Sequence, residues 1–548
     1  MIDDLKAAEL GPDMQTDVCV VGAGAAGVTI ALELARRGRQ VLLLEAGGET
    51  LDPEAQAFYE GENVGHFMEL HEGRYRVFGG STTRWTGRCA TFDPIDFAER
   101  DWLKPSGWPI GAADLQPYYQ RAADWCGFTT PWLDEEAALA AAGPPPPPFD
   151  PERVTPFVWR YAPSGVRNYP DFGRDNAEEM RRSKTLRVLL NAAVTRFHAA
   201  SGAGRLEAVT ARSTTGRAVR VKAHAFVLDC GGLENARLLL ASEEDVPGGL
   251  AGASQDLVGR FFMQHPRGRI ATVAAAEPMM RRMQDAFNVF ATRKPPQYEI
   301  GFTLAEAAQR REGLLNASAI LTYDADPNSG WDRLKSGLRA LPRRPLTGLG
   351  AIARALTDPT DVVRNGWRRG VEGRHPVVRA RQINVVVDLE QAPDPDSRVT
   401  LTEARDPFGM RRARVDWRLS ELERTTSRRF GEHLKDEFAR LGLGELALEP
   451  WLHARGAIGA DDLSGTFHHI ATTRMAADPR QGVVDANCRV HATDNLYLAG
   501  CSVFSTGGHA NPTMTIVALA LRLADHLAKV QEAPTQSAGR DVRAETAA

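Results

Sequence analysis

The sequence has little of several features that would place it in a special class. Its six cysteines show no CxxC or other metal-ligand spacing, so we expect no cysteine metal site. No apolar run approaches the roughly 20 residues that a membrane-spanning helix needs. Lys plus Arg total 66 against 70 for Asp plus Glu, which gives no basic field for a nucleic acid. Cysteine metal proteins, integral membrane proteins and nucleic-acid-binding proteins are therefore not favoured.

What is present is typical of a folded enzyme-sized chain. The 43% hydrophobic and 25% charged fractions are ordinary for globular proteins, and 548 residues exceed what one core supports. Residues 1–14 lack the basic start and apolar centre of a secretory signal. Several cysteines, such as Cys19, lie in apolar runs as reduced buried thiols do. We therefore expect a cytoplasmic protein of two domains or one large interleaved architecture.

Residues 17–45 predict a dinucleotide-binding β-α-β unit. A Val-rich run predicts a buried strand, periodic apolar residues predict a helix up to Gly38, and a second apolar run follows. Between the first strand and the helix stands GxGxxG, in which Gly22 permits a tight turn, Gly24 admits a pyrophosphate and Gly27 allows close helix packing. Glu45 ends the second strand, where it can accept ribose hydroxyls. The motif alone leaves FAD and NAD open.

Further along the chain, strand patterns occur at 186–197, 206–213 and 223–232, and again at 383–391 and 398–404. Helices are predicted at 112–125, from 234 and from 512, where Asn511 is a favoured N-cap and Pro512 a favoured first residue. The proline run at 143–150 predicts an extended surface segment, and the polar residues 531–548 predict a disordered tail.

Residues 331–381 are unusually basic, with 12 Lys or Arg against 4 Asp or Glu. Such a charge run is typical of a solvated, partly mobile insertion. The alternative is a lid, or a docking face for an acidic ligand or membrane headgroups.

Three segments carry a resemblance to a known family: residues 45–48, the GGSTTRWTG loop at 79–87 and NLYLAG at 495–500. They resemble the glucose–methanol–choline (GMC) oxidoreductases, over about residues 16–528. The TTRM and NPTMTI segments, and the Glu-Asn pair after LDCGGL, are closest to the pyranose oxidase and bacterial glycoside oxidase branch. The resemblance implies FAD as the cofactor and an alcohol or sugar as the substrate.

The resemblance implies an α/β fold in which a Rossmann-like FAD-binding domain is interleaved with a substrate-binding domain on a mostly antiparallel sheet. The FAD-binding domain is expected at 15–95, 185–265 and 465–530, and the substrate-binding domain with its insertions at 96–184 and 266–464. The implied FAD contacts are Gly22, Gly24, Gly27, Glu45, Gly80, Ser81, Trp85, Thr86, Val194, Gly500, Cys501, Pro512 and Thr513. Arg84 stands where pyranose oxidases carry a flavin-linked histidine, so we expect FAD to be non-covalent.

The same resemblance places the catalytic pair. Oxidising an alcohol requires a base for the hydroxyl proton and an acceptor, flavin N5, for the hydride. His468 matches the family's catalytic base and Asn511 its hydrogen-bonding partner, while His469 is the alternative base if the register differs by one. Ala471 stands where the branch usually has glycine. His509 either points into the substrate pocket or faces solvent, and His265 is given no catalytic role.

The predicted function is therefore oxidation of a CH–OH group, preferably a secondary alcohol of a sugar or glycoside, with O2, a quinone or a redox protein reoxidising the flavin. Some proteins with the GMC fold are lyases that use the same histidine without net hydride transfer, which is the second hypothesis. A binding protein with an inert histidine pair is the third.

Overall fold

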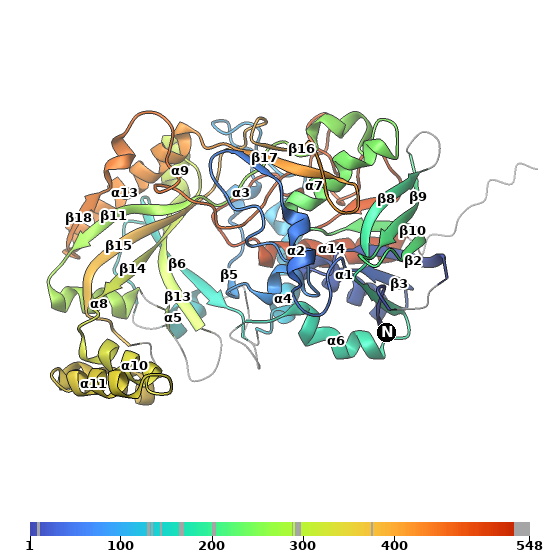
Figure 1. Ribbon diagram of the computed structural model, residues 1–548. Helices are drawn as coiled ribbons and strands as arrows, with labels where there is room; N and C mark the ends of the chain where they lie inside the picture. Colours follow the sequence, from blue (N-terminus) through green and yellow to red (C-terminus); the bar gives the residue numbers. More distant parts are fainter. Residues whose placement is uncertain are drawn as a thin grey trace, which may run out of the picture.

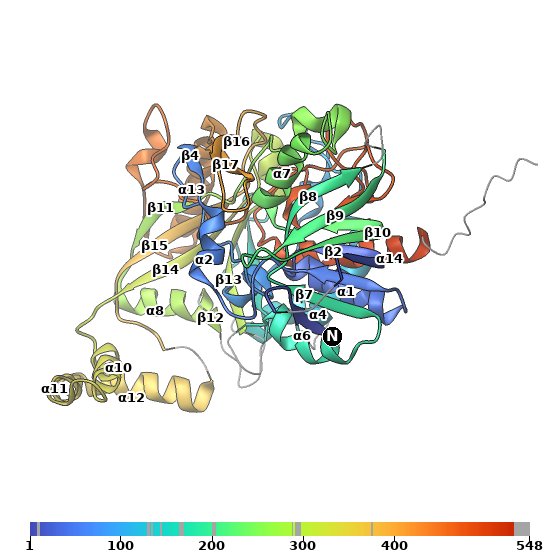
Figure 2. The ribbon, with the colours of Figure 1, turned by 45° about the vertical axis from the view of Figure 1, so that its right-hand side comes forward.

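Figures 1 and 2 show the ribbon of a computed structural model, with a sheet at each end of the molecule. The structure describes residues 1–7, 11–128, 132, 135–142, 145–163, 169–199, 204–287, 289–290, 297–373 and 376–530. The predicted tail at 531–548 and the first two residues of the proline run at 143–150 lie outside the described residues. Residues 145–150 have no helix or strand, as expected for consecutive prolines.

The first sheet contains the dinucleotide-binding unit. Its order is β1 (Ile2–Asp4), β7 (Leu186–Leu190), β3 (Val41–Leu44), β2 (Asp13–Val21), β10 (Ala218–Leu228), β9 (Leu206–Arg212) and β8 (Ala193–Ala199), with β19 (Leu496–Leu498) also on β10. The pairs from β1 to β10 are parallel, and β10, β9 and β8 are antiparallel neighbours. Helix α1 (Ala25–Arg36) connects β2 to β3, as parallel strands require a crossover.

The strand predicted at 186–197 is two strands, β7 and β8. Asn191 has φ = 52°, and asparagine tolerates this left-handed conformation better than most residues. The backbone N–H groups of Asn191 and Ala192 donate to the carbonyls of Gly47 and Glu45, which fixes the turn beside the end of β3. Val194 at the start of β8 is therefore held near the GxGxxG turn.

Four of the described helices pack together beside this sheet. Helix α14 (Thr513–Val530) packs against both α1 and α4 (Ala112–Trp125), and Arg121 of α4 pairs with Glu33 and Asp525. Helix α6 (Phe172–Arg182) also packs here, through an Arg36–Glu179 ion pair. The predicted boundaries assign 96–184 to the substrate-binding domain, whereas α4 and α6 lie with the nucleotide-binding unit, because α6 contacts β7 and α4 packs on α14.

The second sheet is antiparallel throughout its described pairs. Its order is β18 (Glu445–Leu448), β11 (Arg267–Ala274), β15 (Ala380–Leu389), β14 (Ala317–Ala325), β13 (Gln297–Leu304), β6 (Val154–Tyr161) and β5 (Arg88–Cys89), with β12 (Val289–Phe290) on β13. Helix α13 (Glu421–Leu441) begins at a capping box of Ser420 and Glu423 and buries Phe430 and Phe438 in the core on this sheet. Valines and isoleucines of β15 form the facing layer.

The remaining elements are short. A third sheet has the order β16 (Arg398–Arg405), β17 (Arg411–Trp417) and β4 (Glu62–Gly65). The other helices are α2 (Pro53–Gln56), α3 (Pro94–Phe97), α5 (Glu135–Ala142), α7 (Gly232–Ala241), α8 (Glu277–Ala286), α9 (Glu306–Glu312), α10 (Gly330–Ala340), α11 (Pro345–Ala355) and α12 (Pro359–Trp367). Within the described ranges, no helix has the length and apolar character needed to cross a bilayer.

The predicted fold class is confirmed. The strands of the first sheet come from the start, the middle and the end of the chain, and those of the second sheet come from between them. The two sheets have separate hydrophobic cores, so the chain forms two layered units that are interleaved in sequence.

Candidate active site

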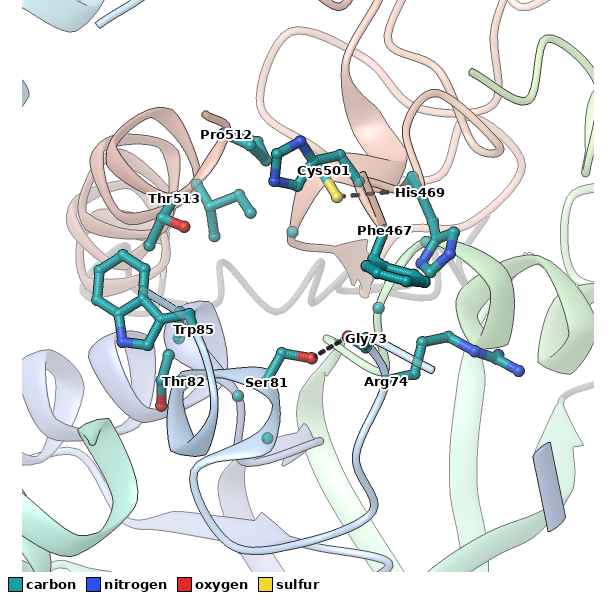
Figure 3. A pocket seen from close by; sticks show the side chains of 18 of the residues that line it. Gly73, Arg74, Ser81, Thr82, Trp85, Phe467, His469, Cys501, Pro512 and Thr513 are labelled. Carbon is teal, nitrogen blue, oxygen red and sulfur yellow. Dashed lines mark hydrogen bonds between the residues drawn. The ribbon is translucent and has the colours of Figure 1, made fainter. Parts of the chain in front are cut away.

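A cavity of about 640 Å³ extends from the end of β2 to the inner face of the second sheet (Figure 3). Every predicted site residue except Gly27 lines it. Its volume is in the range of cofactor and ligand pockets. The two ends differ: the first is rich in glycine, whereas the second contains histidines and a network of charged side chains.

The three motif glycines have distinct geometric reasons. Gly22 has φ = +103°, and a Cβ there would lie 2.1 Å from the carbonyl oxygen of Asp229. A Cβ on Gly27 would lie 1.9 Å from the carbonyl oxygen of Gly22, so Gly27 allows α1 to pack on the turn and does not face the cavity. Gly24 has room around it, as a residue beside a bound phosphate should.

Two buried carboxyls hold the GxGxxG turn in place through hydrogen bonds from its backbone. Glu45 accepts from the backbone N–H groups of Ala23 at 2.9 Å and Gly47 at 2.8 Å. Asp229, which sequence reasoning did not select, accepts from the N–H of Gly27 at 2.5 Å. Burial raises the pKa of each carboxyl to about 7, against the opposing effect of these backbone donors. Both carboxyls line the cavity, where ribose hydroxyls are the expected partners of Glu45.

The loop at 79–86 covers the cavity with small side chains. Residues Gly80–Thr83 form a 3-10 turn, and a Cβ on Gly80 would lie 3.1 Å from the Cα of Gly24. Ser81 Oγ donates to the carbonyl of Gly73 at 2.8 Å (Figure 3), and Trp85 Nε1 donates to the carbonyl of Pro170 at 2.7 Å. The loop is thus held close to the GxGxxG turn.

Three helices begin at the cavity wall. The first residues of α1, α7 and α14 all line it, through Ala25, Gly232 and Thr513. A helix N-terminus offers unpaired N–H groups and a partial positive charge, which suits phosphates and a reduced flavin.

The predicted capping of α14 by Asn511 is not what the structure shows. The first turn closes through Ile516 N–H donating to the carbonyl of Pro512 at 2.8 Å. The Oδ1 atom of Asn511 instead lies 3.5 Å from Nη1 of Arg88, which draws the side chain toward the second sheet. Asn511 therefore lies between the helix and the charged part of the cavity, where it can contact a ligand.

These features fit a flavin dinucleotide. The glycine turn, Glu45 and Val194 suit the adenosine half, the helix N-termini suit the pyrophosphate, and the histidine end suits the reactive ring. In addition, the buried Nε2 of His469 has no hydrogen-bond partner in the described part of the chain, although it lines the cavity. An orphaned buried nitrogen calls for a polar ligand atom.

His468 is held in one tautomer by two neighbours. His265 Nε2 lies 3.0 Å from the carbonyl oxygen of Gly507, which can only accept, so Nε2 carries the proton. Burial lowers the pKa of His265 to about 4, so its ring is neutral and its Nδ1 is an acceptor. His468 Nδ1 lies 2.8 Å from that atom and must donate.

Thr466 gives the same assignment independently. Its hydroxyl donates to the carbonyl of His265 at 3.0 Å, so its oxygen accepts from His468 Nδ1, also at 3.0 Å. Both contacts place the proton of His468 on Nδ1 and leave Nε2 with a free lone pair. Among the described residues Nε2 has no hydrogen-bond partner, and burial together with His265 lowers the pKa of His468 well below its usual value.

The other two histidines have different surroundings. His469 is buried, its ring stacks on Phe262 at 6.0 Å, and burial lowers its pKa to about 3. Its carbonyl accepts from Cys501 Sγ at 3.1 Å (Figure 3). His509 does not face solvent, being 2% exposed; its Nε2 lies 3.2 Å from Oδ2 of Asp93. Burial opposes its charge, but Asp93 outweighs burial and raises the pKa of His509.

Ala471, which stands where the related branch usually has glycine, has a left-handed backbone conformation. Ala471 is fully buried with φ = +69°, a conformation in which glycine is preferred. An alanine there costs roughly 1–2 kcal/mol of backbone free energy. The path is nevertheless kept, because Ala471 N–H donates to the carbonyl of Cys501 at 3.1 Å and Ile470 pairs with Met263.

A partly buried network of alternating charges forms the opposite wall. Arg88 donates to Glu299 at 2.8 Å and to Asp388 at 3.1 Å, and Arg267 binds Asp388 through two nitrogens at 2.6 and 2.7 Å. Tyr161 donates to Glu299 at 3.1 Å. Burial opposes ionisation, yet Arg267 and Arg88 outweigh it and hold the pKa of Asp388 well below its usual range. All five side chains line the cavity.

Sequence reasoning did not select this wall, Asp229, Thr466 or a role for His265. Residues 265 and 468 are 203 positions apart, and no local sequence pattern predicts their contact. Asp229 could have been found, because it follows the carboxyl end of a buried strand and stands two residues before the pair Gly231 and Gly232, a position typical of ligand contacts.

The fold and the cavity define a flavoprotein with an FAD-binding domain and a histidine at the end of its cofactor cavity. Residues 17–321 match the model of the "FAD dependent oxidoreductase" family, and residues 393–520 match that of "GMC oxidoreductase" at its C-terminal part. The chain belongs to the FAD-dependent oxidoreductases and, among them, to the GMC oxidoreductases. The predicted family and the predicted cofactor, FAD, are therefore confirmed.

Named relatives resemble the chain along nearly its whole length. The fructose dehydrogenase large subunit of Gluconobacter japonicus is 22% identical, covering 93% of this chain and 97% of its own. The 6'''-hydroxyparomomycin C oxidase of Streptomyces lividus is 26% identical, covering 94% and 92%. The crystal structure of formate oxidase has a TM-score of 0.57 at 16% identity, covering 95% of this chain and 99% of that one, and shows a shared fold.

Proposed function

We propose that the protein oxidises a secondary alcohol of a sugar or glycoside to a carbonyl, with His468 as general base and Asn511 orienting the hydroxyl. The observation that carries this proposal is the lone pair of His468 Nε2, which two acceptors at Nδ1 leave unprotonated at the cavity. The bound flavin supplies the hydride acceptor. Nε2 accepts the hydroxyl proton, and Asn511, which also lines the cavity, holds the oxygen in place.

The charged wall supports a substrate rich in hydroxyl groups. Carboxylate oxygens of Glu299 and Asp388 are acceptors, while Arg88 has a buried Nη2 without a partner in the described chain. A sugar offers both donors and acceptors to such groups, whereas a hydrocarbon alcohol would leave them unpaired at considerable cost. The names of the relatives, a fructose dehydrogenase and an aminoglycoside oxidase, support the same substrate class.

Anaerobic bleaching tests the function. Purified protein should show a flavin spectrum, and its visible flavin absorbance should fall on addition of a suitable sugar or glycoside in the absence of O2. The screen should contain monosaccharides, glycosides and simple alcohols, with the corresponding deoxy sugars as matched controls. A compound that the protein converts without bleaching would contradict the proposal and would instead favour lyase chemistry.

We also propose that FAD is held non-covalently. Arg84, which stands in the place of the flavin-linked histidine, lies over the ring of Tyr75 at 5.3 Å and cannot form such a bond. Acid precipitation should release the yellow colour into the supernatant, and denaturing mass spectrometry should give the mass of the polypeptide alone. A yellow pellet with a mass increased by that of FAD would contradict this prediction.

The second half-reaction and the location complete the proposal. The relatives include oxidases and dehydrogenases, so O2, a quinone or a redox protein is the proposed oxidant of the reduced enzyme.

The proposed location is a reducing cytoplasm, which is supported by six free cysteines, four of which are buried.

A further inference from the structure

The basic segment found in the sequence forms a helical insertion between β14 and β15. Helices α10, α11 and α12 project from the ends of β14 and β15, two inner strands of the second sheet, away from the rest of the molecule in both views (Figures 1 and 2). Helices α10 and α11 cross closely at Gly337 and Gly348, whose backbones touch. The insertion is fixed to the body, because Asn365 exchanges two hydrogen bonds with the backbone of Val377, at 2.9 and 3.1 Å.

This insertion has a concentration of exposed apolar side chains. Of the eleven large hydrophobic residues that are exposed in the described chain, seven lie on it: Leu338, Leu346, Leu349, Leu356, Val363, Trp367 and Val371. Leu346 is 87% exposed and Trp367 is 58% exposed. Leu346 and Leu349 of α11 and Leu356 directly after it lie outside the face that packs on α10 through Gly348 and Ile352. Such a cluster marks an interaction surface.

Unpaired positive charge surrounds the apolar residues. Residues 330–373 contain nine Lys or Arg and four Asp or Glu. Six exposed arginines form no ion pair with any described residue: Arg339, Arg343, Arg344, Arg354, Arg364 and Arg369. A leucine face with arginines beside it is the pattern of helices that lie in a membrane interface.

We propose that α10, α11 and α12 form a docking surface for an anionic lipid bilayer. The leucines of α11 enter the boundary between headgroups and acyl chains, and the arginines contact lipid phosphates. Charge decides between this occupant and a second copy of the chain, because two such surfaces facing each other would place unpaired arginines together. The cytoplasmic leaflet is anionic, which agrees with the proposed location. The docking surface is separate from the catalytic cavity and does not depend on the proposed function.

Vesicle flotation of the full-length, FAD-loaded protein tests the proposal. The protein should float with phosphatidylcholine vesicles that contain phosphatidylglycerol, should not float with phosphatidylcholine alone, and should be released by added salt. The double variant Leu346→Ser/Leu349→Ser should lower the partition coefficient about tenfold or more, because it removes the inserted apolar area. Arg343→Gln/Arg344→Gln should have an effect of similar size.

Matched controls separate docking from folding. Val530→Ser removes an exposed apolar residue at the end of α14, and Arg182→Gln removes an exposed charge on α6; both should float as the unmodified protein does. All variants should keep the flavin spectrum and the melting temperature. The proposal is overturned by unmodified protein that stays off anionic vesicles, or by variants that float undiminished. Sedimentation that shows a dimer dissolved by the leucine changes would assign the surface to a second copy.

Discussion

Replacing His468 with alanine is expected to slow reduction of the flavin by substrate by a factor of about 10² to 10⁴, the range for removal of a general base. The imidazole has no substitute at its position, because Asn511 cannot accept a proton and Arg267 is already paired with Asp388. FAD binding should persist, since the dinucleotide end of the cavity is formed by Gly22, Glu45 and their neighbours. Anaerobic stopped-flow spectroscopy at saturating substrate measures the rate directly.

Two further variants show whether the loss of rate is specific to His468. His453→Ala removes an exposed histidine that does not line the cavity and should leave the rate unchanged. His469→Ala tests the alternative register: its ring stacks on Phe262 and its Nε2 is buried, so its loss should affect the rate far less than loss of His468. If the rate fell by two orders of magnitude in His469→Ala but not in His468→Ala, the assignment of the base would be wrong.

Much of the fold could be predicted because its signals are local. The β-α-β unit, the helix at 112–125 and the strands at 383–391 and 398–404 each follow from apolar periodicity within a few residues. The break between β7 and β8 was missed because both halves are apolar, and only the left-handed Asn191 separates them. The packing of α4 and α6 on the nucleotide-binding sheet depends on contacts with α14 and α1, which the order of the chain does not reveal.

The residues of the candidate site also fall into a predicted group and a missed group. The residues that resemblance provided, from Gly22 to Thr513, line one cavity with the exception of Gly27. The charged wall was missed because Arg88, Glu299 and Asp388 come from three distant strands that meet only in the folded sheet. The capping role predicted for Asn511 rested on local preference, and Arg88 overrides that preference by drawing the side chain away. Local chemistry thus identified the cofactor end better than the substrate end.

The double variant His265→Leu/Thr466→Val is expected to lower the reduction rate by a factor on the order of 10² to 10³. It removes both acceptors of His468 Nδ1, so nothing keeps the proton there, and the ring can place its proton on Nε2. Loss of a tautomer-fixing partner costs about 10⁴ in a serine protease, and a smaller effect is expected here because the imidazole remains buried. If position 265 of the double variant carries asparagine in place of leucine, an acceptor near Nδ1 is restored. This His265→Asn change should recover most of the reduction rate.

Recovery by asparagine distinguishes this positioning role from simple destabilisation. Burial holds the pKa of His468 well below 6.5, so the base stays unprotonated and the rate of the unmodified protein should be constant as the pH falls from 8 to 6. His265 is neutral in this interval, so its hydrogen bond fixes the tautomer of His468 and not its charge, and the double variant should be slower by the same factor at each pH. A double variant whose rate is not recovered by His265→Asn would show that His265 and Thr466 only support the loop.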